Sequence, residues 1–145
     1  MSEHLDAAEI ERRLVVEFPQ AFGPKGSMHI EAAALMRARL RLAVAERHLR
    51  PGNTISGPAM FELADCALYV AVLATVGWIP LAATTSLTLN FLARPQVRDL
   101  VADSRLLRVG RTLAVGEVSI RSQGGDTILA HATGTYVLPR HTTVS

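Results

Sequence analysis

The chain has 145 residues, a length that fits a single domain able to bury a sizeable core. Its 15 lysines and arginines against 13 aspartates and glutamates give a net charge of +2, and the basic residues are scattered along the chain. This distribution lacks the electrostatic footprint of a nucleic-acid-binding protein, so no polyanion partner is expected.

The N-terminal segment, residues 1–24, is expected to form a short helix and a loop. Residues 5–18 carry apolar side chains near helical spacing, and Pro19 ends the run. The first residues are acidic and amphipathic, without the basic-then-apolar order of a secretory signal. The single cysteine, Cys66, excludes an internal disulfide. A reducing, cytoplasmic location is therefore expected.

One or two strands follow before residue 49. From Met36 to Val44, apolar residues alternate strictly with Arg37, Arg39 and Arg41. A period of two predicts a strand with one buried face. The sequence RPGN then has the composition of a turn.

The next segment, residues 55–77, predicts a long apolar helix with a carboxylate, Asp65, near its middle. Ser56 suits the N-cap, Pro58 is tolerated in the first turn, and Gly77 suits the stop. The apolar run is long enough to span a membrane, but a mid-bilayer aspartate costs roughly 2.5 to 3.5 kcal/mol. We therefore interpret the segment as a helix enclosed by the rest of the protein, not as a membrane span.

The C-terminal half predicts strands joined mostly by tight turns. Alternating or apolar runs cover residues 84–92, 98–109, 112–122 and 127–138. The apolar phase shifts within the third run, so a bulge is expected near Gly116. An α+β arrangement, with an antiparallel sheet curled around the apolar helix, satisfies all these elements. One layer of sheet leaves the helix partly uncovered, and a second copy packing alongside would cover it.

Three motifs in this order carry a resemblance to a known family: RPGNTISGPAMFELAD, LTLNFLARP and RVGRTLAVGEV. From about Phe22 to Pro139 the chain resembles the hotdog-fold thioesterases, specifically the phenylacetate-degradation (PaaI-like) group. The resemblance implies a curved antiparallel sheet of five to six strands around one long central helix, with a short N-terminal helix. It makes 1–145 a single domain, with residues 25–139 as the hotdog core and 140–145 as a tail.

The chain departs from that group at one place. Where the group has His-Gly-Gly, this chain has Ser56-Gly57-Pro58, so the imidazole and one backbone N–H are missing. Gly57 keeps its N–H, at the positive end of the helix dipole, where it suits a donor to a carbonyl oxygen that gains charge.

The activity implied by the resemblance is hydrolysis of an acyl-CoA thioester to free acid and CoA, without a cofactor or metal. The resemblance assigns Asp65 as general base or nucleophile. Gly57 and Asp65 are eight residues apart, about 12 Å along one helix. The two residues of one chain therefore cannot both contact the thioester group of one substrate molecule. Gly57 of a second copy with an antiparallel helix could do so. The hypothesis predicts an obligate dimer and leaves a dimer of dimers open.

The resemblance implies further candidates on the segments around the helix. A hydroxyl that holds the attacking water is assigned to Ser86, with Thr85 as the alternative. Arginines suit the phosphates of coenzyme A, and those considered are Arg94, Arg98, Arg108 and Arg111. The substrate-binding candidates are Asn53, Ser56, Pro58, Thr85, Arg94 and Arg111.

Structural roles compete with these functional ones. Asp65 could be a paired carboxylate, Ser56 is first of all a helix cap, and Glu62 suits a solvated helix position. Cys66 suits core packing, and His131 is not expected to bind a metal.

Two other functions are compatible with the same fold. With the histidine and one glycine replaced, the chain could bind an acyl-CoA or related ligand without hydrolysing it. The hydratase or dehydratase branch relies on an Asp-His or His-Glu pair, and the absence of a histidine near Asp65 in sequence counts against it.

Overall fold

The computed structural model describes residues 5–139, so residues 1–4 and the expected tail 140–145 lie outside the described part. The elements in chain order are α1 (Ala7–Glu17), α2 (Pro19–Phe22), β1 (Met28–Ala34), β2 (Arg37–Leu42), the 3-10 helix η1 (Glu46–His48), β3 (Leu49–Arg50), β4 (Thr54–Ile55), α3 (Gly57–Val76), β5 (Ala83–Phe91), β6 (Leu100–Val109), β7 (Leu113–Ser122) and β8 (Ala130–Val137). The helices and strands expected from the sequence are present, and RPGN turns between β3 and β4.

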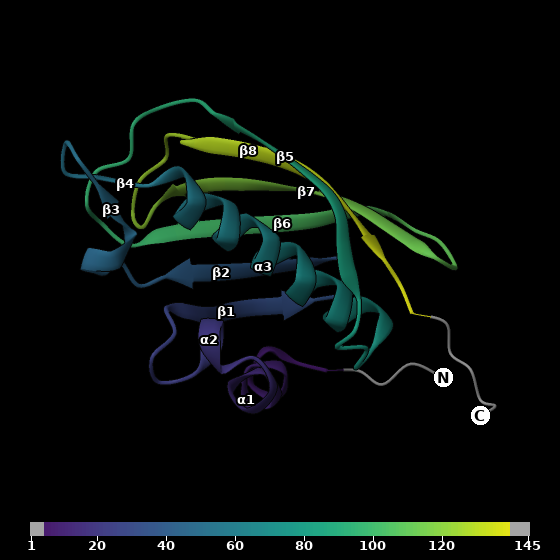
Figure 1. Cartoon of the computed structure of the whole chain (residues 1–145). Helices are drawn as coiled ribbons and strands as arrows, with labels where there is room; N and C mark the ends of the chain where they lie inside the picture. The colour runs from purple at the N-terminus through teal and green to yellow at the C-terminus, as the bar shows by residue number, and fades with distance from the viewer. Residues whose placement is uncertain (1–4, 140–145) are drawn as a thin grey trace.

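One curved sheet surrounds the central helix. Its six strands are antiparallel and lie in the order β1-β2-β6-β7-β8-β5, and the sheet wraps α3 while α1 and α2 lie beside β1 (Figure 1). All six strands contact α3, because the concave face and the helix are both apolar. The expected architecture, an antiparallel sheet around one long helix with a short N-terminal helix, is confirmed.

Both ends of α3 follow the capping residues in the sequence. The Ser56 hydroxyl accepts a hydrogen bond from the Ala59 N–H at 3.3 Å. Gly77 ends the helix with φ at 113° and donates its N–H to the Leu73 carbonyl at 3.0 Å. By length and composition α3 could cross a membrane, but 67% of its apolar window is buried inside the fold. Most of its apolar window is therefore packed inside the fold.

Two glycines let α3 approach the sheet closely. Gly116 of β7 and Gly134 of β8 are paired across the two strands, and Leu68 of α3 lies over both. A Cβ at Gly116 would lie 2.7 Å from Leu68 Cδ2 and 2.8 Å from the Arg105 carbonyl oxygen. A Cβ at Gly134 would lie 2.8 Å from Leu68 Cδ1. The pair forms a recess for one leucine side chain.

The expected bulge lies on a different strand. The register between β6 and β7 shifts between Leu106 and Arg108, so the extra residue is Leu107, opposite Gly116. Within β7 the alternation is unbroken, and Leu113 and Val115 lie on the outer face. The prediction of a bulge near Gly116 is therefore right in its position along the sheet but wrong in its strand, because apolar residues on the outer face of β7 imitate a phase shift.

A smaller difference concerns the start of β2. The alternating run began at Met36, but Met36 lies in the β1–β2 turn with φ at 69°, and β2 begins at Arg37. A side chain in a turn thus continued the strand pattern by coincidence.

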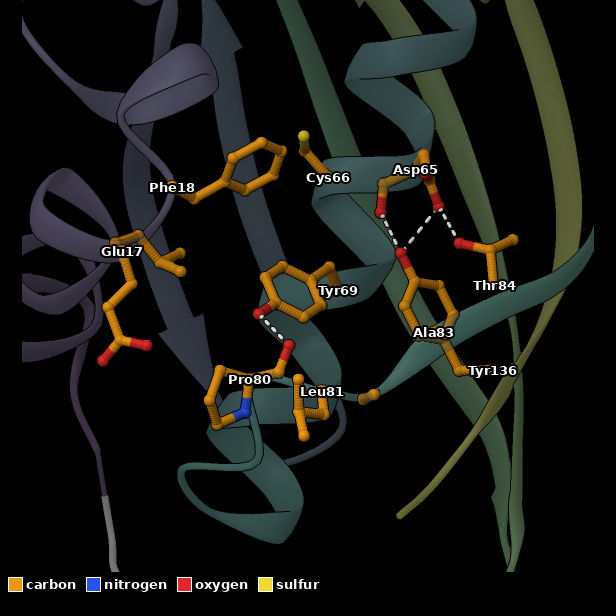
Figure 2. Close-up of a pocket in the computed structure, with 12 residues that line it drawn as sticks. Glu17, Phe18, Asp65, Cys66, Tyr69, Pro80, Leu81, Ala83, Thr84 and Tyr136 are labelled. Carbon is orange, nitrogen blue, oxygen red and sulfur yellow. Dashed lines mark hydrogen bonds between the residues drawn. The ribbon is translucent and has the colours of Figure 1, made fainter.

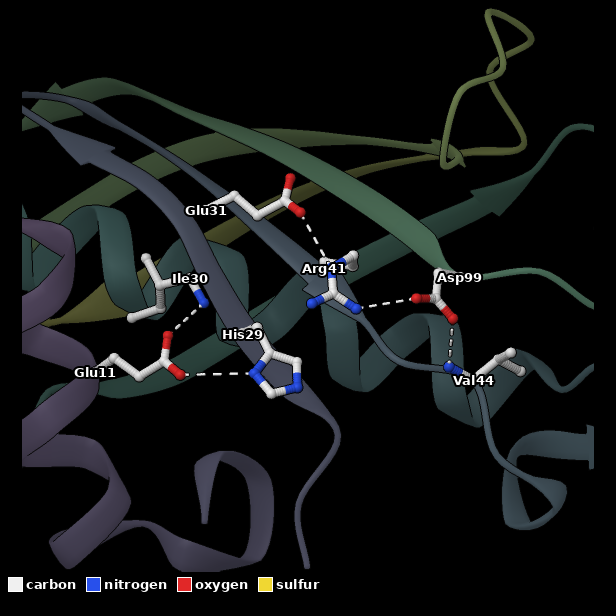
Figure 3. A network of polar contacts seen from close by, with 7 residues as sticks. All are labelled: Glu11, His29, Ile30, Glu31, Arg41, Val44 and Asp99. Atoms are coloured by element: carbon white, nitrogen blue, oxygen red, sulfur yellow. Dashed lines mark hydrogen bonds and ion pairs between the residues drawn. The ribbon is translucent and has the colours of Figure 1, made fainter. Parts of the chain in front are cut away.

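The N-terminal helix covers the β1 edge of the sheet. The Glu11 carboxylate of α1 accepts the Ile30 N–H at 2.8 Å and lies 3.6 Å from the His29 ring (Figure 3). Beside it, Arg41 of β2 pairs with Glu31 and Asp99, and Asp99 also accepts the Val44 N–H at 3.0 Å (Figure 3). A side chain of α1 therefore occupies a hydrogen-bonding position that an added strand would need.

Replacement of Gly116 by alanine should lower the free energy of unfolding by about 1–3 kcal/mol, because the new methyl group overpacks Leu68 and the neighbouring backbone. Gly110→Ala is the matched control, since a Cβ there meets nothing closer than 3.5 Å. Urea denaturation of both variants measures the difference. Equal stability of Gly116→Ala and the unaltered protein would contradict the proposed recess.

Candidate active site

Asp65 lies in the middle of α3 and carries two short side-chain hydrogen bonds. Its Oδ1 accepts from Thr84 Oγ1 of β5 at 2.6 Å and from the Tyr136 hydroxyl of β8 at 2.6 Å (Figure 2). The same tyrosine hydroxyl lies 2.9 Å from the Asp65 backbone carbonyl. Asp65 is half-buried and stands at the wall of a hollow.

This Asp65 hollow has a volume of about 370 Å³. Aromatic rings form one side: Tyr69 stacks on Tyr136 with centroids 6.1 Å apart, and Phe18 meets Tyr69 edge-on at 6.4 Å (Figure 2). The Tyr69 hydroxyl donates to the Pro80 carbonyl at 2.8 Å, which ties the segment before β5 to α3. Phe18 follows α1, so the N-terminal segment contributes to the wall, which is largely apolar.

Burial controls the protonation of the groups around Asp65. It raises the pKa of Tyr136, and the nearby Asp65 carboxylate adds to this effect. Burial, with a contribution from Glu17, raises the pKa of Tyr69 to about 12. Both phenols therefore remain hydrogen-bond donors at neutral pH. The pKa of the Cys66 thiol is also raised, first by burial and then by Glu62 and Asp65.

A second hollow, of about 400 Å³, lies at the start of α3 and contains Gly57. As the first residue of the helix, Gly57 has an N–H without an intrahelical acceptor, while Pro58 has no N–H at all. A Cβ on Gly57 would lie 3.1 Å from Phe91 Cζ, so the glycine keeps the backbone accessible beside that ring. Arg50 and Arg94 line this Gly57 hollow.

The two hollows lie at opposite ends of β5. Ala83 and Thr84, at its start, line the Asp65 hollow, and Phe91, at its end, lines the Gly57 hollow. Within one chain the structure thus keeps Asp65 and Gly57 in separate hollows, as their spacing on one continuous helix requires.

The hydroxyl that reaches Asp65 belongs to Thr84, not to Ser86 or Thr85. The register between β5 and β8 shifts between Thr84 and Ser86, and Thr85 instead donates to the Thr135 carbonyl at 3.3 Å. Ser86 pairs with Thr135 further along the strand. The shift in register therefore makes Thr84 the β5 hydroxyl that is bonded to Asp65, while the role of Ser86 or Thr85 in holding the attacking water stays a prediction.

The other candidates are divided among several places. Asn53 is exposed in the β3–β4 turn with φ at 56°, and Ser56 acts as the helix cap. Exposed Pro58 stands in the first turn of α3, beside Gly57. Arg94 lies with Gly57, whereas Arg111 lines a different hollow with Val76, at the far end of α3. The structure thus groups Arg94, but not Arg111, with Gly57.

None of the remaining candidates, Arg98, Arg108, Glu62 and His131, lines the Asp65 hollow or the Gly57 hollow. Arg98 donates to the Gln123 carbonyl at 2.9 Å, and Arg108 and Glu62 are exposed. His131 lies 3.1 Å from Glu117, and residues 5–139 contain no group of three or more metal-type side chains that could hold an ion.

Tyr136 and Thr84 are the site residues that the sequence did not identify. Tyr136 is 71 residues from Asp65, and the pairing of β8 with β5 and β7 in the sheet brings it there. Tyr136 lies two residues after Gly134, so in the alternating pattern of β8 both point to the core face. This alternation is the sequence signal that could have placed Tyr136 near the helix.

The curved sheet, the central helix and the carboxylate at an apolar hollow define a hotdog-fold protein of the thioesterase type. The sequence profile of the thioesterase superfamily matches residues 52–129, and the chain belongs to that superfamily. Membership places the chain among the acyl-thioester hydrolases in general. No curated protein matches the chain.

Solved structures agree with this assignment. A candidate thioesterase from a Silicibacter species is 44% identical, with 93% of this chain and 92% of that chain covered and a TM-score of 0.83. A point mutant of the phenylacetic acid degradation protein PaaI from Thermus thermophilus is 21% identical over 78% of this chain and 94% of that chain, with a TM-score of 0.68. A Streptococcus mutans protein bound to acetyl CoA is 21% identical over 78% and 89%, with a TM-score of 0.69. The resemblance to the hotdog-fold thioesterases is confirmed, and the PaaI structure shares the fold.

Cys66 should react slowly with iodoacetamide in the native protein, because its raised pKa keeps the thiol protonated and the side chain is buried. Between about pH 7 and pH 9 the native rate should be at least about tenfold below that of protein unfolded in urea. Mass spectrometry of the alkylated protein measures both rates. Native labelling as fast as labelling of the unfolded chain would show that Cys66 is an accessible thiol.

Proposed function

We propose that the protein is a PaaI-like acyl-CoA thioesterase that hydrolyses an acyl-CoA to free acid and CoA without a cofactor or metal. The observation that carries the proposal is the Asp65 carboxylate, held by hydrogen bonds to one oxygen at the wall of an apolar hollow. Carboxylates act in thioester hydrolysis as a base for water or as a nucleophile.

The proposed hydrolysis can take two alternative forms, which differ in the group that attacks the thioester carbon. In the general-base form, Asp65 takes a proton from water as the water oxygen attacks the thioester carbon. The carbon–sulfur bond then breaks, and CoA leaves as a thiolate that takes up a proton. In the nucleophilic form, the carboxylate itself attacks the thioester carbon, the carbon–sulfur bond breaks and CoA leaves as a thiolate that takes up a proton, and water then hydrolyses the anhydride to the acid and free Asp65. In both forms the Gly57 N–H of a second copy stabilises the oxyanion.

The shape of β5 supports a composite site. As an edge strand, β5 can pair with the same strand of a second copy. Antiparallel pairing centred between Leu87 and Thr88 would place Thr84 of one chain opposite Phe91 of the other. The start of β5 lines the Asp65 hollow and its end lines the Gly57 hollow, so this pairing would join the two into one site.

Exposed apolar side chains support the same arrangement. Phe91 and Leu92 at the end of β5 are 58% and 60% exposed, and Phe61 on α3 is 42% exposed. Burial of these side chains against a second copy would remove apolar surface from water. The dimer follows from this proposal, while pairing of dimers into tetramers and a cytoplasmic location stay predictions.

The Gly57 hollow is also the proposed entrance for coenzyme A. The acetyl-CoA complex of a protein with the same fold supports this ligand class. Arg50 and Arg94 line the hollow and suit phosphate groups. Arg111 lies at the opposite end of α3, so the geometry favours Arg94 over Arg111 for this role.

A ligand-binding protein without hydrolysis is the second candidate. It is favoured by Pro58, which removes a backbone N–H at the helix start where the PaaI-like group has a second glycine. Binding of acyl-CoA by the purified protein without release of free thiol would select this candidate.

Asp65→Asn should lower kcat/KM for the best acyl-CoA by about 100-fold or more, since the amide cannot act as a base or nucleophile. Glu62→Gln, which neutralises an exposed carboxylate three residues earlier, is the control and should retain activity. Release of free CoA thiol from a panel of acyl-CoAs is the measurement. The proposed function fails if no acyl-CoA is hydrolysed, and the role of Asp65 fails if Asp65→Asn is as active as the unaltered enzyme.

A heterodimer of Asp65→Asn and Gly57→Pro chains should recover about half of the activity of the unaltered dimer, because one of its two composite sites is intact. Proline removes the Gly57 N–H and is tolerated in the first helical turn. Two affinity tags allow the heterodimer to be purified, and each variant homodimer should be impaired.

The matched control pairs an Asp65→Asn chain with a chain that carries both substitutions, so that no site is intact. If each site were built from one chain, the first heterodimer would be no more active than this control.

A further inference from the structure

We propose that Tyr136 is a positioning residue for Asp65: with Thr84 it holds Oδ1 and so leaves Oδ2 as the oxygen that acts on water or substrate. This inference rests on the proposed hydrolase function and concerns the same site. Among the described residues, the two side-chain hydrogen bonds that Asp65 accepts from Thr84 and Tyr136 both end on Oδ1, at 2.6 Å, and neither ends on Oδ2.

The sheet holds the two donors side by side, because Thr84 and Tyr136 are direct cross-strand partners in the β5–β8 ladder. Their Cβ atoms therefore point to the same face of the sheet, toward α3. The pairing shifts immediately after Thr84, so this register ends at the residues that touch Asp65. Figure 2 shows both hydroxyls converging on the Asp65 side chain.

Tyr136 is the more rigid of the two donors. Its side chain is buried, and its ring stacks on that of Tyr69. The Tyr136 hydroxyl lies within hydrogen-bond distance of both Oδ1 and the backbone carbonyl of Asp65. One hydroxyl therefore contacts both the side chain and the backbone of Asp65, and this contact restricts rotation of the short aspartate side chain.

Burial also keeps this donor in the correct protonation state. Because the pKa of Tyr136 is raised, the phenol remains protonated over the whole neutral range and can donate only as O–H. A carboxylate accepts and does not donate when ionised, so the polarity of the contact with Asp65 is defined. A small displacement of a reacting group can cost about 100-fold in rate, which is why the orientation of this oxygen matters.

Tyr136→Phe tests the proposal, because the ring and its stacking remain while the hydroxyl is lost. We expect kcat to fall by about 10- to 100-fold and KM to change by less than about threefold. Tyr69→Phe is the matched comparison, since it removes a hydroxyl from the same hollow that contacts Pro80 and not Asp65. Its loss of kcat should be at least about tenfold smaller. Circular dichroism and light scattering check that both variants remain folded and in the same assembly.

Crystal structures of the unaltered protein and of Tyr136→Phe give a readout that does not depend on activity. We expect one Asp65 rotamer in the first and more than one, or a rotated carboxylate, in the second. An Asp65 carboxylate that keeps its orientation in Tyr136→Phe overturns the proposal, whether or not kcat falls. Equal losses of kcat in the two tyrosine variants also overturn it. If the unaltered protein hydrolyses no thioester, the proposed function fails, and the two crystal structures alone decide whether Tyr136 positions Asp65.

Discussion

The contact of Leu68 with the paired glycines of β7 and β8 sets how deeply the central helix lies in the sheet. Asp65 precedes Leu68 by three residues, so the two side chains lie about one helical turn apart. The depth that seats Leu68 thus also sets the distance from Asp65 to the strands. A side chain at either glycine would push the helix outward and carry the carboxylate away from Thr84 and Tyr136. Packing in the core and geometry at the site are consequences of the same close approach.

The parts of the structure that depend on local chemistry could be predicted from the sequence. Ser56 and Gly77 mark the ends of α3 because capping and chain reversal are satisfied by neighbouring residues. Asp65 was identified because a carboxylate is costly in an apolar segment unless it has partners or a function. Strand existence followed from alternation, since a period of two is a property of the strand itself.

The parts that depend on register could not be predicted. Whether Thr84, Thr85 or Ser86 reaches Asp65 is decided by an irregularity in the β5–β8 pairing, which no local pattern records. The extra residue at Leu107 was hidden because Leu113 and Val115 are apolar on the outer face. Tyr136 was missed for a related reason: its partner is 71 residues away and is brought close only by the sheet.

The contact of α1 with β1 limits how copies of this chain could pair through their sheets. A sheet with two open edges can add strands at both, and repeated addition produces ribbons without an end. Here Glu11 occupies the Ile30 N–H at one edge, and α1 lies against the same strand. The opposite edge, β5, is the one available for pairing. An isologous contact through a single edge uses up that edge in both partners, so assembly by strand pairing closes after two chains instead of propagating.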